Sequence, residues 1–344
     1  MNPISDKLIS WYQINKRDLP WRDSTDPYKI WLSEIILQQT QVAQGLNYYL
    51  KFIENFPNVI ALANADEDLV MRLWEGLGYY SRARNLHFTA KLISSKFNGV
   101  FPNTYVEIKQ LKGVGDYTAA AISSFAFKLP HAVVDGNVYR VLSRLFNIET
   151  PINSSLGKKE FQLVANDILN TNNPDLHNSA IMEFGALFCK PQNPDCSACP
   201  LQENCLAFKN KTVIKLPVKI NKTKIKDRYF NYFIFNYKTD VYVRKRKEKD
   251  IWQNLYEFYL IETPHIVDEK ELLNDKNFNK LSQKFLLQNK KIMKKHILTH
   301  QHIYAIFYEL ELQQPLKTKS FIKIKRSELI HYAFPKLINN YLIN

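Results

Sequence analysis

The feature that most constrains this chain is a group of four cysteines that lie close together in the sequence. Cys189, Cys196, Cys199 and Cys205 are the four cysteines of the 344 residues, and their spacing is C-x6-C-x2-C-x5-C. Four thiolates so close together can hold one metal centre, and no cysteine is left to cross-link elsewhere, so the group indicates a metal or iron-sulfur site rather than a disulfide framework. Zinc stays open as an alternative, although four-thiolate zinc sites usually combine two short C-x2-4-C knuckles and this group has one.

The chain is strongly basic, which favours a polyanionic partner. Lys and Arg number 47 against 33 Asp and Glu, a formal net charge of +14. Nucleic acid is the commonest such partner, and a merely solvated lysine-rich surface is the alternative. No stretch approaches the roughly 18 apolar residues of a membrane span or resembles a signal peptide. We therefore expect a monomeric bacterial-type protein of the cytoplasm, associated with the nucleoid, where thiols stay reduced.

The pattern along the chain predicts two domains of different class. Residues 1–208 have apolar positions at three- and four-residue spacing, typical of a mainly α domain. Residues 209–228 carry seven Lys and one Arg against a single acid, and this composition predicts an exposed basic linker. Residues 229–344 contain strand-like runs at 228–237, 240–246, 255–262 and 302–312 and a closing helix near 334–342, which indicates an α+β domain.

A glycine-containing turn in the helical part could hold a phosphate. In LKGVGDYTAAAI, at 111–122, Gly113 and Gly115 bracket Val114 before a helix begins. Two glycines permit a tight turn with outward backbone N–H groups, and the helix N-terminus adds a positive field. Such a turn can bind a DNA phosphate without reading sequence, whereas by itself it also suits an ordinary helix-helix connection.

Several motifs together resemble the helix-hairpin-helix DNA glycosylase superfamily, and more narrowly the MutY-type adenine DNA glycosylases. They cover about the first 200 residues in the family's order: LPW at 19–21, WLSEIILQQTQV at 31–42, WEGLGYYSRARNL at 74–86, LKGVGDYTAAAI at 111–122, VVDGNVYRVLSR at 133–144 and the cysteine group. The resemblance implies a two-lobed helical fold with a helix-hairpin-helix at about 107–125. It also implies one 4Fe-4S cluster held by the four cysteines in the loop 189–205.

The resemblance implies two catalytic carboxyls with different tasks. Glu34 lies among apolar neighbours in WLSEIILQQ, where lost hydration would raise its pKa and let it donate a proton to a base nitrogen. An exposed Glu on a polar helix face is the alternative. Asp135 precedes a helix and suits an N-cap. In the family this position stabilises the cation that develops on the deoxyribose, or bonds to C1′ covalently.

Tyr117 distinguishes the chain from endonuclease III-like relatives. In those enzymes a Lys at this position attacks C1′ and continues to strand cleavage through an imine, which a tyrosine cannot form. The resemblance therefore implies a monofunctional glycosylase, in which Tyr117 supports Asp135 and Asn137 positions the same site. A tyrosine that merely fills the hairpin's apolar core is the alternative.

The resemblance also names residues for the target base and its partner. Chemistry on a stacked base requires base flipping, and Gln39 and Tyr79 are the candidates to fill the gap and contact the opposite nucleotide. The same reasoning places three further side chains around the flipped adenine: Trp21, Arg22 and Val42.

The C-terminal domain resembles the Nudix-like domain of this family, whose task is to recognise 8-oxoguanine. A Nudix hydrolase needs glycines and a Glu cluster, but no glycine follows Gly185, so pyrophosphatase activity is disfavoured. The family's Phe-Ser-His reading loop corresponds here to Leu298, Thr299 and His300. As the alternative, His296, His300 and His302 share one parity and would form one polar face of a single strand.

The sequence thus predicts a base excision repair enzyme that removes adenine mispaired with 8-oxoguanine or guanine in double-stranded DNA, with little or no lyase activity. An endonuclease III-like glycosylase and lyase that acts on oxidised pyrimidines is the alternative enzyme. A catalytically silent lesion-binding protein is the alternative from another class, and the intact Glu34 and Asp135 speak against it.

Overall fold

The computed structural model describes residues 2–220, 225–279, 281 and 285–343. The chain forms two compact units. The first, called the helical unit, comprises residues 1–64 and 85–221, and the second, called the sheet unit, comprises residues 65–84 and 222–344. The sheet unit thus includes a helical segment from the N-terminal half of the sequence.

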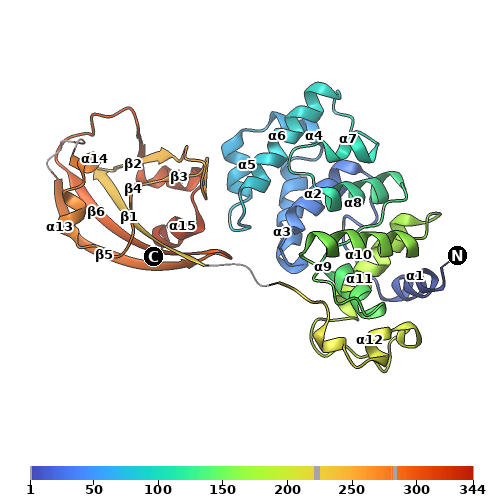
Figure 1. Ribbon diagram of the computed structural model, residues 1–344. Helices are drawn as coiled ribbons and strands as arrows, with labels where there is room; N and C mark the ends of the chain where they lie inside the picture. The colour runs from blue at the N-terminus through green and yellow to red at the C-terminus, as the bar shows by residue number, and fades with distance from the viewer. Residues whose placement is uncertain (1, 221–224, 280, 282–284, 344) are drawn as a thin grey trace. The chain divides into compact units, whose positions relative to one another are not determined.

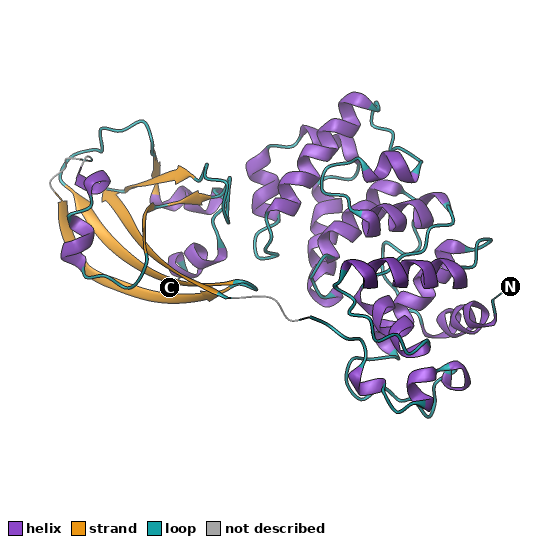
Figure 2. Cartoon of the chain, viewed as in Figure 1, coloured by secondary structure: helices purple, strands orange, loops and turns teal. Residues whose placement is uncertain are grey.

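The helical unit consists of helices joined by short loops, with no strand among its described residues (Figures 1 and 2). Side chains of the residues before the helices cap many of them. Asp26, for example, accepts from the backbone N–H of Tyr28 at the start of α2, where Pro27 is the first helical residue. The helices are α1 (Pro3–Asn15), α2 (Pro27–Leu37), α3 (Val42–Asn55), α4 (Val59–Asn64), α6 (Ser81–Lys96, which begins in the sheet unit), α7 (Tyr105–Lys109), α8 (Asp116–Phe127), α9 (Gly136–Leu145), α10 (Ser155–Ile168), α11 (Pro174–Leu187) and α12 (Leu206–Lys209).

Two packed groups of helices build the helical unit. The α2 helix is buried along most of its length and packs on α3 and α8. The other group joins α1, α9, α10 and α11 around a core that includes Leu8, Leu142, Phe161 and Phe184. Burying an aliphatic or aromatic side chain contributes roughly 1.5–3 kcal/mol, so each group has a substantial core of its own.

The sheet unit is built on a seven-stranded mixed sheet. Its central strands β1 and β6 pair in parallel, and the pairs β1–β2, β1–β4, β2–β3, β2–β7 and β5–β6 are antiparallel. The elements are α5 (Glu67–Leu73), β1 (Lys226–Tyr237), β2 (Asp240–Lys245), β3 (Tyr256–Glu257), β4 (Tyr259–Thr263), α13 (Glu269–Leu273), α14 (Lys276–Asn279), β5 (Phe285–Ile297), β6 (Gln301–Leu312), β7 (Ile322–Lys325) and α15 (Lys336–Leu342).

Both faces of the central strands are covered. On one face, Phe233 of β1 packs against Phe278 of α14 at 4.7 Å between ring centroids. On the other face, Phe307 of β6 stacks on Tyr341 of α15 at 4.2 Å and on Tyr232 of β1 at 5.3 Å. Two buried faces explain why β1 is an almost continuous run of aromatic and aliphatic residues rather than an alternating one.

The helical and α+β classes predicted for the two parts are confirmed, but two strands escaped prediction. Strands β5 and β7 were not expected, because their lysine-rich sequences resemble solvated loops. The alternative of a single strand carrying His296, His300 and His302 is wrong. His296 lies on β5 and His302 on β6, because the chain reverses in the turn between them, where the Leu298 N–H donates to the Gln301 carbonyl at 2.8 Å.

The segment 209–228 was expected to be an exposed basic linker, and most of its described residues are exposed or partly exposed, but both of its ends are bonded to folded structure. Its first half is held on the helical unit, where Arg144 donates to the carbonyls of Val213 and Leu216 and the Ile152 N–H donates to the carbonyl of Val218. Its last three residues, 226–228, belong to β1. Residues 221–224 lie outside the described residues.

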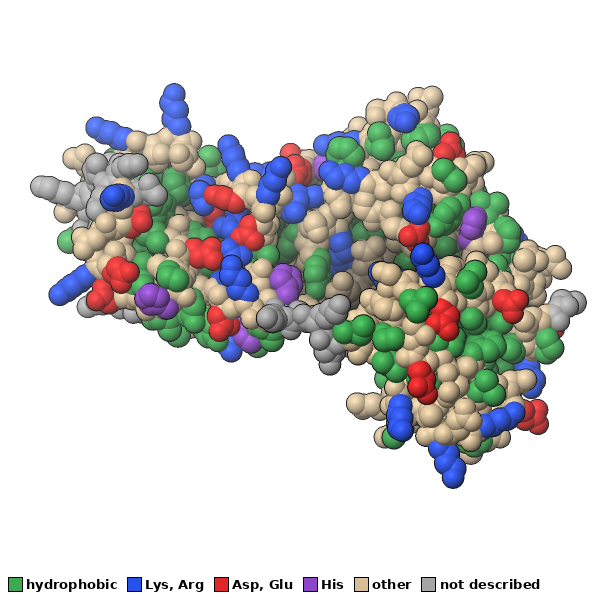
Figure 3. Space-filling view, in the orientation of Figure 1, with side chains coloured by type: hydrophobic (Ala, Val, Ile, Leu, Met, Phe, Trp, Pro, Cys, Tyr) green, Lys and Arg blue, Asp and Glu red, His purple; other side chains and the backbone are tan. Residues whose placement is uncertain are grey.

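Within the described residues no helix combines the length and the apolar character that crossing a bilayer requires. On the face shown in Figure 3, Lys and Arg side chains are spread over both units with Asp and Glu side chains between them.

Candidate active site

A cavity of about 390 Å³ in the helical unit brings together the residues expected to be catalytic. Glu34 comes from α2, Tyr117 from α8, and Asp135 and Asn137 from the start of α9. Their convergence depends on the packing of α2 against α8 and of α9 against α11. The lining also includes the three residues predicted for the adenine pocket, Trp21, Arg22 and Val42, together with Arg17, Ser179, Met182 and Glu183.

Glu34 is a buried carboxyl, and burial changes its acidity. It is 8% exposed in the fully buried middle of α2. Loss of hydration, helped by the negative charge of Asp135 and opposed by a hydrogen bond from Tyr117, raises the pKa of Glu34 to about 7. A carboxyl with a pKa near neutrality can give or take a proton at physiological pH.

Asp135 is the N-cap of α9, as its position before the helix predicted. Its Oδ1 accepts from the backbone N–H of Asn137 at 2.8 Å and of Val138 at 2.7 Å, and its Oδ2 accepts from the Asn137 side chain at 2.8 Å. Desolvation raises the pKa of Asp135 above its ordinary value, although these donors and the charge of Arg140 oppose the rise. The carboxylate is thus fixed in direction and surrounded by donors that favour its charged form.

Tyr117 lies between the two carboxyls. It hydrogen-bonds Glu34, and desolvation together with the charges of Glu34 and Asp135 holds its pKa well above the ordinary value. The phenol therefore stays protonated as a donor. Tyr117 also packs against the small core formed by Ala120, Ala121 and Val133, so it fills apolar space as well as contacting the site.

Glu183 is a residue of the cavity that the sequence did not suggest. It is 1% exposed and accepts from Arg17 at 2.7 Å and from Arg22 at 2.5 Å. Despite desolvation, these hydrogen bonds lower the pKa of Glu183 to about 2. Arg22, expected beside the adenine, is thus engaged by Glu183. The sequence signal that could have revealed Glu183 is that it is the one acidic residue in the largely apolar run NSAIMEFGAL.

The other two residues predicted for the adenine pocket come from different sides of the cavity. Trp21, in the loop before α2, packs its ring against Tyr49 at 5.0 Å between centroids in an edge-to-face arrangement. Val42 begins α3 and also lines the cavity. Trp21 supplies an aromatic surface and Val42 an aliphatic one, which suit contact with a flat base.

The hairpin turn lies between α7 and α8. Gly113 has φ +84°, and a Cβ there would meet the Asn85 Cβ at 2.8 Å, so both backbone and space require glycine. Gly115 is the N-cap residue of α8, and a Cβ there would meet nothing within 4 Å. Val114 is 8% exposed and anchors the turn in the unit.

The four cysteines follow α11 and are partly buried. Desolvation and neighbouring thiols raise the pKa values of Cys196, Cys199 and Cys205. A positive metal centre would relieve that repulsion, so the donor set fits a thiolate-ligated group. Among the described residues, no three His, Cys, Asp or Glu side chains are arranged to hold a single metal ion.

Two arginines of α9 tie the cysteine loop to the cavity. Arg140 donates to the Cys189 carbonyl at 2.7 Å and to Asn137 Oδ1 at 2.8 Å. Arg144 donates to the Lys190 carbonyl at 2.7 Å and to Cys189 Sγ at 3.4 Å. Sequence reasoning missed both arginines, which lie in the predicted motif at 133–144 but carry no spacing signal of their own.

The residues expected to contact the opposite nucleotide fall into both units. Gln39 is exposed just after α2, in the helical unit, with φ 55°. Tyr79, Thr299 and His300 line a second cavity of about 450 Å³ within the sheet unit. There Tyr79, with φ 46°, shares a hydrogen bond of 2.7 Å with the hydroxyl of Thr299.

Two family models match the chain. The model of the HhH-GPD superfamily base excision DNA repair proteins matches residues 32–166, and the NUDIX domain model matches residues 231–344. The first range contains Glu34, Tyr117 and Asp135. Together with the fold, these matches define a DNA glycosylase, a hydrolase of N-glycosyl bonds, with a Nudix-like second part.

Known proteins narrow this class further. An adenine DNA glycosylase of Buchnera aphidicola subsp. Baizongia pistaciae is 38% identical over 302 residues, which cover 86% of this chain and 83% of that protein. The human adenine DNA glycosylase is 44% identical over 209 residues, 58% of this chain and 38% of that protein. The chain belongs to the adenine DNA glycosylase family.

Solved structures share the helical fold. A thermostable thymine-DNA glycosylase is 26% identical with a TM-score of 0.56, covering 60% of this chain and 95% of that one. A trapped covalent intermediate of endonuclease III with DNA is 23% identical with a TM-score of 0.52, with the same coverage.

The acidity of Glu34 should be visible as a pH-dependent stability difference. Because its pKa of about 7 when folded exceeds the ordinary 4.5, the folded state binds more protons between these values, and the free energy of unfolding falls as pH rises through that window. Glu34→Gln removes this loss. We expect the free energy of unfolding of the variant, relative to that of the parent protein, to increase by about 3 kcal/mol between pH 4.5 and 7, at roughly 1.4 kcal/mol per pKa unit.

Denaturant unfolding between pH 4.5 and 8 measures this difference, with Glu54→Gln on the exposed side of α3 as the matched control. A stability difference for Glu34→Gln that does not change with pH would show that Glu34 titrates normally.

Proposed function

We propose that this protein hydrolyses the N-glycosidic bond of adenine mispaired with 8-oxoguanine or guanine in double-stranded DNA. The observation that carries the proposal is the buried Glu34, whose pKa is raised to about 7, opposite the N-cap carboxylate Asp135 in one cavity. The names of the relatives that cover most of the chain support adenine as the target.

The two carboxyls divide the chemistry. Glu34 donates a proton to a nitrogen of the flipped adenine, so that the bond to C1′ breaks with its electron pair going to the base. The sugar is left with positive charge, which the Asp135 carboxylate stabilises until water adds to C1′ and gives its proton to the now ionised Glu34. Asn137 holds Asp135 by its 2.8 Å hydrogen bond, and Tyr117 keeps Glu34 in place.

The enzyme releases the base without cutting the strand. Strand cleavage by this superfamily needs an amine at the position of Tyr117 to form an imine with C1′. The phenol of Tyr117 has no nitrogen and cannot form an imine. The alternative function, an endonuclease III-like lyase that acts on oxidised pyrimidines, is therefore disfavoured, because it requires an amine nucleophile at the position of Tyr117.

The remaining predicted residues bind DNA and recognise the oxidised base. The turn of Gly113, Val114 and Gly115 binds a phosphate of the damaged strand through its backbone N–H groups and the α8 N-terminus. Gln39 fills the gap left by the flipped adenine. In the sheet unit, the cavity beside Tyr79 receives the oxidised base, which explains why Thr299 and His300 line it.

The cysteine group holds one 4Fe-4S cluster. The residues that hold it are Cys189, Cys196, Cys199 and Cys205, and the donors of Arg144 reach the first of them at 3.4 Å. When bound, the cluster would supply a fixed charge and would cross-link this loop, and it would not take part in the reaction. Through Arg140 the loop keeps Asn137, and hence Asp135, in position.

Base excision under single-turnover conditions tests the function directly. We expect adenine release opposite 8-oxoguanine and guanine but not opposite thymine, with strand breaks that appear only after alkali. Glu34→Gln should lower the rate at least about a hundredfold, the usual loss for a general acid, while the exposed Glu54→Gln should not. Strand cleavage without alkali, or excision of an oxidised pyrimidine, would instead favour the lyase alternative.

Elemental analysis and visible spectroscopy test the cluster. We expect iron rather than zinc in the purified protein, with a brown colour from thiolate-to-iron charge transfer. Cys199→Ser should lose the colour and lower the melting temperature, because the loop loses a ligand. A colourless, well-folded protein that contains zinc would contradict the iron-sulfur assignment.

A further inference from the structure

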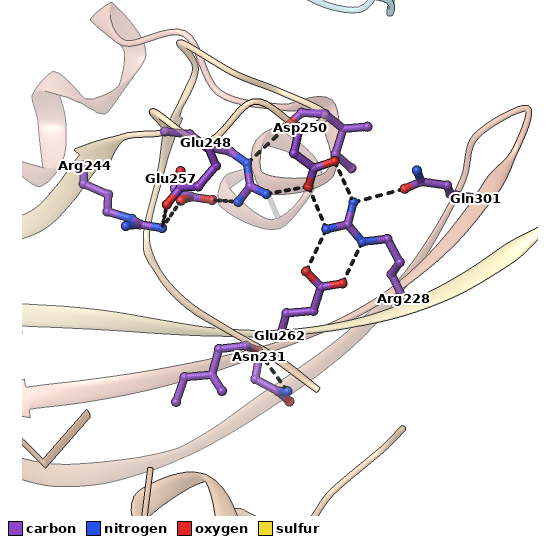
Figure 4. A network of polar contacts seen from close by, with 11 residues as sticks. Arg228, Asn231, Arg244, Glu248, Asp250, Glu257, Glu262 and Gln301 are labelled. Carbon is purple, nitrogen blue, oxygen red and sulfur yellow. Dashed lines mark hydrogen bonds and ion pairs between the residues drawn. The ribbon is translucent and has the colours of Figure 1, made fainter. Parts of the chain in front are cut away.

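Three arginines and four acids form a network of ion pairs in the sheet unit (Figure 4). Arg246 binds both Asp250 and Glu257 at 2.9 Å, and Arg244 binds Glu257 at 2.7 Å. The remaining members are Arg228, Glu248 and Glu262.

Arg228 is the centre of this network. Its guanidinium makes five hydrogen bonds: two of 2.7 Å to the carboxylate of Glu262, two of 3.0 and 2.7 Å to Asp250, and one of 3.2 Å to Gln301 Oε1. These bonds match the five donors of an arginine. The residue is 8% exposed and its guanidinium lies 4.8 Å from the centre of the Phe230 ring. Its orientation is therefore fixed on every side.

The bonds of Arg228 lead to two walls of the cavity of the sheet unit. One wall is the loop that contains Asp250, Ile251 and Trp252, and the other is the turn from His296 to His300. Asp250 belongs to the first wall, and Gln301 directly follows the second. The indole of Trp252 and the ring of His296 lie 5.9 Å apart, so the walls approach one another closely.

The first wall has a backbone that needs external support. Trp252 has φ 62° and Asn254 has φ 66°, a left-handed conformation that asparagine tolerates but that is costly for a bulky residue such as tryptophan. Such a conformation persists where the surroundings enforce it. Arg246 does so directly, since its Nε donates to the Ile251 carbonyl at 3.0 Å and its own carbonyl accepts from the Asn254 N–H at 2.8 Å. The loop is thus held in one conformation by the network.

We propose that Arg228 is a positioning residue for recognition of the base opposite the target adenine. Because it binds Asp250 and Gln301 at once, it fixes the separation between the Trp252 loop and the Thr299 turn, and this separation sets the fit of an oxidised purine. The inference rests on the proposed function of the cavity. It adds a determinant of specificity that does not itself touch the base.

A purely stabilising network is the competing explanation, and the two differ in a measurable way. Buried ion pairs are often close to neutral for stability, whereas removal of one partner leaves costly unpaired charge. An Arg228 variant would therefore confuse misfolding with lost recognition. Gln301 is the better target, because its loss removes the side-chain bond from Arg228 to the residue after the turn and leaves the four bonds of Arg228 to carboxylates intact.

The experiment measures the concentration for half-maximal single-turnover excision on duplexes with adenine opposite 8-oxoguanine or guanine. For Gln301→Leu we expect the preference for 8-oxoguanine over guanine to fall about three- to tenfold, with an unchanged rate at saturation. A change of this size corresponds to part of the free energy of one charge-assisted hydrogen bond. Gln301→Glu keeps an acceptor for Arg228 and should restore the preference. Glu248→Gln, which breaks only the exposed pair with Arg244, should leave it unchanged.

A Gln301→Leu protein that melts earlier but keeps the full preference would overturn the proposal and leave the network a structural role. Failure of Gln301→Glu to restore a lost preference would overturn it as well, because the Arg228 bond would then not be the cause. If the parent protein itself does not prefer 8-oxoguanine over guanine, the proposed function of the cavity fails first, and this result is distinguishable from both.

Discussion

The hydrogen bonds at the beginning of α9 are the interaction on which the rest of the active site depends. Asp135 caps the helix, and the donors that cap it also fix the direction of its carboxylate. The Asn137 side chain donates to Asp135 and accepts from Arg140, and Arg140 also donates to the Cys189 carbonyl. Hydrogen bonds at the beginning of this helix therefore connect the Asp135 carboxylate to the cysteine loop, so the order of the candidate site depends on the order of that loop.

Two carboxyls in one cavity acquire different acidities because their surroundings differ. Glu34 lies in the middle of a buried helix, where the backbone N–H groups are already paired within the helix, so desolvation dominates and its pKa rises to about 7. Desolvation also raises the pKa of Asp135, but two backbone N–H groups at the start of α9 and the Asn137 side chain oppose that rise because they favour the charged form. A proton donor beside a stable anion is the arrangement that cleavage of a bond to a poor leaving group requires.

The sequence predicted those parts of the molecule whose signals are local. Helical periodicity, the residue before α9 and the Gly113 turn each depend on neighbours in the chain. Strand β5 escaped because its lysines resemble a solvated loop, although an edge strand tolerates them. Glu183, Arg140 and Gln301 escaped for a different reason, since their partners lie 166, 49 and 73 residues away and single-sequence periodicity contains no such information.

The most direct test of the account is the pH dependence of the single-turnover excision rate in the parent protein and in Tyr117→Phe. If Glu34 is the proton donor, the rate falls as pH rises past about 7. Since the Tyr117 hydrogen bond lowers the pKa of Glu34, its removal should shift this fall to higher pH. A rate that declines near the ordinary pKa of a carboxyl, or a decline that Tyr117→Phe does not move, would contradict the central role of Glu34.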